Sequence, residues 1–141
     1  MTYTNNRSQQ GFTLVEILIA IAIVAIMAVV TVPSYLGRLE RGRADATRQS
    51  LRVVKSAVEQ FYGDVGQFPE RLDDLVKKPT NEKLAKKWVS PYIEKKPRDG
   101  WGNQFQYKPT PGQEQQYELY SFGKNGKGAP RSEWISVWKV K

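Results

Sequence analysis

One carboxylate lies inside the long apolar run near the N-terminus, and its chemical role has to be explained first. From Phe12 to Val32 the only residues that are not hydrophobic are Thr13, Glu16 and Thr31. Such a run can cross a membrane as a helix, because about 20 helical residues span the hydrocarbon core. A charge at the centre of a bilayer costs roughly 2.5–3.5 kcal/mol on insertion scales. We therefore expect Glu16 to be paired or to have a function.

The other residue types argue against catalysis. The sequence has no cysteine and no histidine. This excludes a disulfide, a thiolate nucleophile and a sulfur-ligated metal, and it removes the commonest general base. Asp73 and Asp74 are adjacent carboxylates on a predicted exposed helix, where neighbours point about 100° apart, so we do not expect an acid–base pair. No GxxxxGK[ST] phosphate-binding motif is present. We expect no enzymatic activity.

The net charge of +8 lies entirely in the segment from Gly37 onward, because Arg7 and Glu16 cancel in the part before it. Two interpretations stay open. The basic surface is either simply solvated, or it attracts anionic lipid head groups, acidic partners or nucleic acid. Several arginines just beyond the apolar run could contact lipid phosphates: Arg38, Arg41, Arg43, Arg48 and Arg52.

A single long helix is predicted from residue 12 to about residue 62. Its first part is apolar all round, as expected of a segment embedded in lipid. Pro33 removes one backbone hydrogen bond and is expected to kink or locally melt the helix, and Gly37 is a second weak point. Beyond them, residues at spacings of three and four indicate a stripe that faces a domain core. These are Ala44, Thr47, Leu51, Val54, Val58 and Phe61.

The remainder of the chain predicts an α+β domain. Gly63, Gly66 and Pro69 end the long helix, and short helices are expected over 70–77 and 81–88. Alternating patterns predict strands over 104–108, 116–122 and 134–140. A Gly-rich basic loop, 123–132, separates the last two. Four aromatic residues are expected on the core face of the sheet: Phe105, Tyr107, Tyr117 and Tyr120.

The N-terminal residues 1–11 are polar and carry one arginine. The apolar run that follows is too long for an ordinary secretory signal, and no A-x-A cleavage pattern comes after it. Cleavage is instead favoured between Gly11 and Phe12, which would leave the apolar segment on the mature protein.

The motif GFTLVE (11–16), followed by an apolar span and Pro33, resembles the class III signal of type IV pilin-like proteins. The soluble part is similar to the major pseudopilins of type II secretion systems. This similarity covers nearly the whole chain and rests on YGDVGQFP (62–69), DGWGNQFQY (99–107) and YSFG (120–123). The second segment discriminates most, and its Trp101, Gly102 and Asn103 are expected to form a structural turn packed on the helix.

This resemblance implies a type IV pilin-like fold, in which a long N-terminal helix packs on a small antiparallel sheet with a C-terminal loop. Residues 1–11 would be a leader peptide, 12–36 the membrane and assembly half of the helix, and 37–141 a periplasmic globular domain. A prepilin peptidase would cut after Gly11 and the Phe12 amine would be methylated. Glu16 would pair with the Phe12 amine of a neighbouring subunit and set the filament register.

Two alternatives to these roles stay open. Glu16 could instead reach the lipid head groups or bond to its own helix N-terminus. Pro33 is either a segment that melts when the subunit leaves the bilayer or one of the prolines that are common in membrane helices.

The C-terminal loop departs from the family pattern. Major pseudopilins usually hold calcium there, and their two ligand aspartates match Ser132 and Trp134 in a segment that begins at Ser121. Calcium takes about six to eight oxygen ligands, and only Glu133 is acidic in this loop. We expect no metal and no other cofactor, with calcium as the alternative. The side chains of Trp134 and Trp138 are expected to hold the loop.

The resemblance implies a structural subunit that polymerises into a type II secretion pseudopilus and helps to drive folded proteins across the outer membrane. The implied partners are further copies of the chain, a prepilin peptidase/methyltransferase, minor pseudopilins, an inner-membrane assembly platform and an outer-membrane secretin. No nucleic acid is expected. A type IV pilin of a surface filament, used in adhesion, motility or DNA uptake, is the alternative.

The predicted orientation involves a conflict. Counting arginines around the span favours an N-terminus outside the cytoplasm, although long domains translocate largely regardless of charge. The resemblance places the leader in the cytoplasm and the domain in the periplasm of a single-pass inner-membrane protein, and we follow it.

Overall fold

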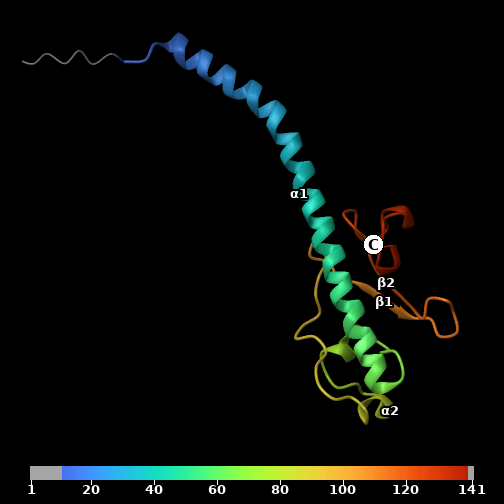
Figure 1. Ribbon diagram of the computed structural model, residues 1–141. Helices are drawn as coiled ribbons and strands as arrows, with labels where there is room; N and C mark the ends of the chain where they lie inside the picture. Colours follow the sequence, from blue (N-terminus) through green and yellow to red (C-terminus); the bar gives the residue numbers. More distant parts are fainter. Residues whose placement is uncertain (1–10, 140–141) are drawn as a thin grey trace, which may run out of the picture. The chain divides into compact units, whose positions relative to one another are not determined.

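The computed structural model describes residues 11–139, and most of the predicted leader therefore lies outside the described residues (Figure 1). The described residues form two compact units, which divide between Leu39 and Glu40. Helix α1 (Leu14–Val65) contributes to both. It begins two residues after the predicted start and ends three residues after the predicted end, in agreement with the long apolar and amphipathic patterns.

The first unit consists of the apolar part of α1. Its side chains are exposed in the isolated chain, and α1 is long and apolar enough to cross a membrane. The Thr31 hydroxyl donates to the Met27 carbonyl oxygen at 2.8 Å, which satisfies this polar group within the helix itself. The helix continues through Pro33 and Gly37 without interruption. A kink or local melting at these two positions stays a prediction about assembly.

The core of the second unit is built on the amphipathic half of α1. The stripe predicted from the sequence is buried from Thr47 to Phe61, and Val65 extends it by one turn. Full burial of one such aliphatic side chain contributes about 1.5–3 kcal/mol, so this stripe is a main source of stability. The residues that complete the core come from the segments after the helix: Leu75, Leu84, Phe105, Tyr117, Leu119 and Val137.

Three antiparallel strands form one sheet in the order β1-β2-β3. They are β1 (Gln106–Pro109), β2 (Tyr117–Ser121) and β3 (Ile135–Ser136). Tyr107 pairs with Leu119, and Tyr120 pairs with Ser136. The last strand is shorter than predicted, because the chain turns into the 3₁₀ helix η3 (Val137–Lys139) and the Trp138 indole donates to the Tyr117 carbonyl oxygen at 2.9 Å.

One aromatic residue lies on a different face from the one predicted. In β2, Tyr117, Leu119 and Ser121 are buried, whereas Glu118 and Tyr120 between them are half-buried. Successive side chains of a strand point to opposite faces, so Tyr120 cannot share the core face with Tyr117. The prediction that Tyr120 is a core residue was wrong for this reason.

The two predicted short helices are shorter than expected: they are the 3₁₀ helix η1 (Leu72–Leu75) and the helix α2 (Glu82–Ala85). A further 3₁₀ helix, η2 (Arg131–Glu133), overlaps the end of the predicted loop and was not predicted. At η1, Asp74 is buried and accepts the backbone N–H groups of Glu70 and Arg71, each at 3.0 Å. The predicted exposure of Asp74 was therefore wrong.

Asp73 has a separate partner, Lys96, whose ammonium donates to it at 2.9 Å and lowers the pKa of that carboxyl. Asp73 and Asp74 thus serve two different structural contacts.

A buried tyrosine, Tyr117, and a half-buried one, Tyr107, offer a test of hydrogen bonding in this core. The Tyr117 hydroxyl has no hydrogen-bond partner among the described residues, and burial raises its pKa to about 12. The Tyr107 hydroxyl donates to the Pro69 carbonyl oxygen at 2.8 Å.

We predict that Tyr117→Phe leaves the free energy of unfolding unchanged or raises it by up to about 1 kcal/mol, whereas Tyr107→Phe lowers it by about 1 kcal/mol. Urea unfolding of the full chain in detergent measures both, and equal losses would contradict this assignment.

Candidate assembly site and C-terminal loop

Glu16 closes a capping box at the start of α1. Thr13 precedes the first helical residue and Glu16 is the third residue of the helix. The Glu16 Oε2 atom accepts the Thr13 backbone N–H at 2.9 Å and its hydroxyl at 3.2 Å. In return the Thr13 Oγ1 atom accepts the Glu16 backbone N–H at 3.2 Å. This reciprocal arrangement satisfies N–H groups that a helix start leaves unpaired, and the positive end of the helix dipole favours the carboxylate.

The same contacts leave half of the carboxylate available. Within residues 11–139, no donor contacts Glu16 Oε1. Gly11 and Phe12 precede the helix and are exposed, Phe12 to 86 %. The isolated chain thus shows Glu16 bonded at its own helix start, with one oxygen atom and the adjacent Phe12 open to a neighbour.

In the second unit, Asp99 organises the DGWGN segment. Its side chain is only 5 % exposed. Oδ1 accepts the backbone N–H groups of Trp101 and Asn103 at 3.0 and 2.8 Å, and Oδ2 accepts the Ser121 hydroxyl at 2.6 Å. Ser121 Oγ in turn accepts the Gly123 N–H at 2.9 Å. One carboxylate therefore connects the turn to the end of β2 and to the beginning of the C-terminal loop.

This turn docks closely on α1. The Gly100 N–H donates to Thr47 Oγ1 at 2.8 Å, and the Thr47 hydroxyl donates to the Arg43 carbonyl oxygen at 2.7 Å. A Cβ atom at Gly100 would overlap that carbonyl group, so only glycine fits. The Trp101 indole donates to Glu40 at 3.1 Å.

Sequence reasoning singled out Trp101, Gly102 and Asn103 but missed Asp99 and Thr47. Gly102 adopts a φ of +86°, a conformation that favours glycine. An Asp three residues before such a glycine is the available signal, because its side chain can accept backbone N–H groups further along. The role of Thr47 has no comparable local signal, since its partner Gly100 is 53 residues away.

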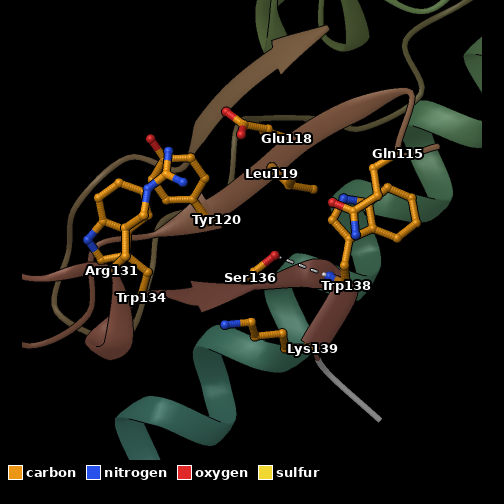
Figure 2. A pocket seen from close by; sticks show the side chains of 9 residues that line it. All are labelled: Gln115, Glu118, Leu119, Tyr120, Arg131, Trp134, Ser136, Trp138 and Lys139. Atoms are coloured by element: carbon orange, nitrogen blue, oxygen red, sulfur yellow. Dashed lines mark hydrogen bonds between the residues drawn. The ribbon is translucent and has the colours of Figure 1, made fainter. Parts of the chain in front are cut away.

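Aromatic side chains hold the C-terminal loop, and Figure 2 shows Tyr120 and Trp134 beside each other. The rings of Tyr120 and Trp134 stack with centroids 4.4 Å apart and an interplanar angle of 1°. The Trp134 indole donates to the Ala129 carbonyl oxygen at 2.9 Å, and the Arg131 guanidinium lies 5.3 Å from the Trp134 ring centroid. Trp138 lies at the other end of the same hollow of about 150 Å³ and contacts β2.

The residues that match the family's usual calcium position offer few carboxylate ligands. Ser121 is buried and its hydroxyl is engaged by Asp99, while Ser132 is exposed. The Glu133 carboxylate accepts a hydrogen bond from the Asn125 side-chain amide. Across the described part of the chain, no group of three or more histidine, cysteine, aspartate or glutamate residues could hold a metal ion. Calcium is usually bound with carboxylates among its about six to eight oxygen ligands, and Glu133 is the one acidic side chain of this loop.

Comparison with known proteins identifies the family to which the chain belongs. A family model described as type II secretion system (T2SS), protein G, matches residues 34–138. The chain belongs to this family. A second model, the prokaryotic N-terminal methylation motif, matches residues 6–32 and so includes Gly11, Phe12 and Glu16.

Curated relatives of this protein G family are similar over almost their full length. The type II secretion system core protein G of Pseudomonas aeruginosa is 34 % identical over 138 residues, which cover 94 % of this chain and 96 % of that protein. The protein of the same name from Vibrio cholerae is 31 % identical over 139 residues, which cover 95 % of this chain and 94 % of that protein.

The fold also agrees with a solved member. The crystal structure of the major pseudopilin from the type 2 secretion system of enterohaemorrhagic Escherichia coli superposes with a TM-score of 0.63. The two sequences are 24 % identical, and the superposition covers 74 % of this chain and 94 % of the Escherichia coli chain. The predicted type IV pilin-like fold is thereby confirmed.

Proposed function

We propose that this chain is a structural subunit that polymerises into the pseudopilus of a type II secretion system and helps to move folded proteins across the outer membrane. The observation that carries the proposal is the pair of family matches, which together span residues 6–32 and 34–138. A protein whose N-terminal segment matches the methylation motif and whose remaining chain matches the protein G family is best explained as a filament subunit. The work of transport would come from a separate ATPase, because the sequence has no phosphate-binding motif of its own.

Glu16 is the group best suited to set the register of the filament. Cleavage after Gly11 would create an α-amine at Phe12, which is mostly protonated near neutral pH because its reference pKa is about 7.7–8.0. The open Glu16 Oε1 could then accept this amine from the next subunit while Oε2 keeps its bonds to Thr13. A subunit in the wrong register would leave both charges unpaired in apolar surroundings, which is strongly unfavourable.

The proposed cellular setting follows from the same family. The mature protein would cross the inner membrane once, with its globular domain in the periplasm, and it would have no catalytic role. Its partners would be the prepilin peptidase/methyltransferase, minor pseudopilins, the inner-membrane assembly platform and the outer-membrane secretin. Pro33 and Gly37 would allow the helix to melt locally as the subunit enters the filament.

Charge removal at Glu16 tests the assembly role. We predict that Glu16→Ala and Glu16→Gln both reduce the yield of filaments at least about tenfold, because an unpaired buried amine costs several kcal/mol per interface. Electron microscopy and shearing assays measure the yield. Glutamine can still act in a capping box, so the second variant separates the charge from the helix cap. Glu114→Ala, at an exposed loop position, is the matched control. Normal filaments from Glu16→Gln would rule out the ion pair.

We also infer that the C-terminal loop closes without calcium, through the Trp134 stack and the Asn125–Glu133 contact. A chelator should therefore shift the melting temperature by less than about 2 °C, whereas Trp134→Ala should lower it by at least about 8 °C, because loss of about 2 kcal/mol shifts Tm by that amount in a domain of this size. Circular dichroism follows both transitions. A large drop with chelator that added calcium reverses would show a metal site.

A further inference from the structure

The positive charge of the chain is concentrated in one short segment. Residues 77–98 contain eight lysine or arginine residues and two glutamates, a net charge of +6 out of +8 for the whole chain. This segment lies between η1 and β1 and includes α2. If the basic surface were simply solvated, its positive charges would be spread over the domain. Their concentration in one segment therefore indicates a local role.

The centre of this segment is a basic hollow. Lys83, Lys86 and Lys87 line it together with Val65, Leu84 and Gln67, and its volume is about 290 Å³. The three lysines are exposed, and none forms an ion pair or a side-chain hydrogen bond with a described residue. Lys83 lies in α2, and Lys86 and Lys87 follow it by three and four positions in the turn after the helix. Like charges at this spacing repel each other, and Glu82 is the one acidic residue of α2. An anionic partner would relieve the remaining repulsion.

The scaffold beneath the basic hollow is fixed. The Asn81 side chain accepts the Lys83 N–H at 3.0 Å and donates to Glu70 at 2.8 Å. Leu84 is only 2 % exposed, and the Trp88 indole donates to the Asp74 carbonyl oxygen at 2.9 Å. The lysines thus project from a positioned turn, so little backbone entropy is lost when a partner binds.

The chemistry of the surface favours an acidic polypeptide over a nucleic acid. Nucleic-acid surfaces combine arginine forks with exposed aromatic rings. Here Trp88 is half-buried and hydrogen-bonded, and Arg98 donates to the Gly102 carbonyl oxygen. The apolar surface here is aliphatic instead: Val89, nearby in the sequence, is 72 % exposed, whereas Leu84 and Val65 line the hollow but are themselves almost fully buried. Carboxylates would pair with the lysines and an aliphatic side chain would contact Val89, which together describe an acidic peptide.

We propose that the basic hollow is a docking site for an acidic, aliphatic-containing segment of a partner protein. The site is independent of Glu16, so it can fail or hold without affecting the assembly role. Binding would depend strongly on ionic strength, because exposed charges are screened within about 8 Å at physiological salt.

The test measures fluorescence anisotropy of a labelled (Glu-Glu-Leu)₄ peptide with the full chain in zwitterionic detergent. The triple variant Lys83→Glu, Lys86→Glu, Lys87→Glu should weaken binding at least about tenfold, which corresponds to about 1.4 kcal/mol. The control triple Lys108→Glu, Lys124→Glu, Lys127→Glu makes the same change in net charge at exposed positions outside the segment. It should stay within about threefold of the wild type, because the long-range effect of net charge is weaker than direct contact.

Two further probes decide the class of partner. A twelve-nucleotide oligo(dT) and vesicles that contain phosphatidylglycerol should bind more weakly than the peptide. Equal losses in the two triple variants, or no loss in the first, would overturn the docking site. Tighter binding of oligo(dT) or vesicles, lost in the first triple variant, would overturn the assignment to a protein partner. The glutamine triple at the same three lysines, which halves the charge change, keeps the test valid if the reversal variant fails to fold.

Discussion

A carboxylate in apolar surroundings must find a partner, and this requirement at Glu16 constrains the first half of the molecule. In the isolated chain the partner is local, because Thr13 engages one oxygen atom and closes the helix start. The second oxygen atom stays open beside Phe12. In the proposed filament, the apolar helix that follows would supply the area for contact between subunits, but hydrophobic contact has no direction of its own. One charge at a fixed helical position would supply that direction, because only one register would satisfy it.

The globular unit depends on a second carboxylate, Asp99. It fixes the DGWGN turn, accepts the Ser121 hydroxyl and, through Ser121, positions Gly123 at the start of the C-terminal loop. Gly100 then brings the turn against α1 at Thr47. Hydrogen bonds to Thr47 thus join the turn to the helix, and hydrogen bonds to Ser121 join it to the sheet and the loop. The stack of Trp134 on Tyr120 closes the remaining loop, so aromatic packing holds the region in which the family resemblance leads one to expect calcium.

The sequence was sufficient for the features that depend on local periodicity. It predicted the long helix within three residues at each end, and it predicted all three strands, because these patterns arise from burial of one face. It was insufficient where distant residues decide. The short β3 results from the Trp138 contact with Tyr117. The error at Tyr120 was local instead, because the alternation of faces within β2 already separates it from Tyr117. The Asp99 hub depends on Ser121, 22 residues away. The family motif led to Gly11, Phe12 and Glu16, whose roles in assembly concern contacts with other chains.

The most direct test of the pairing between Glu16 and a new amine is the mass of the N-terminal peptide from the protein in native membranes. Pairing requires a free amine at Phe12, so the account predicts a mature chain that begins with N-methylated Phe12. A chain that retains Met1, or one cut beyond the apolar run, would lack that amine beside Glu16. Either result would contradict the proposed register mechanism.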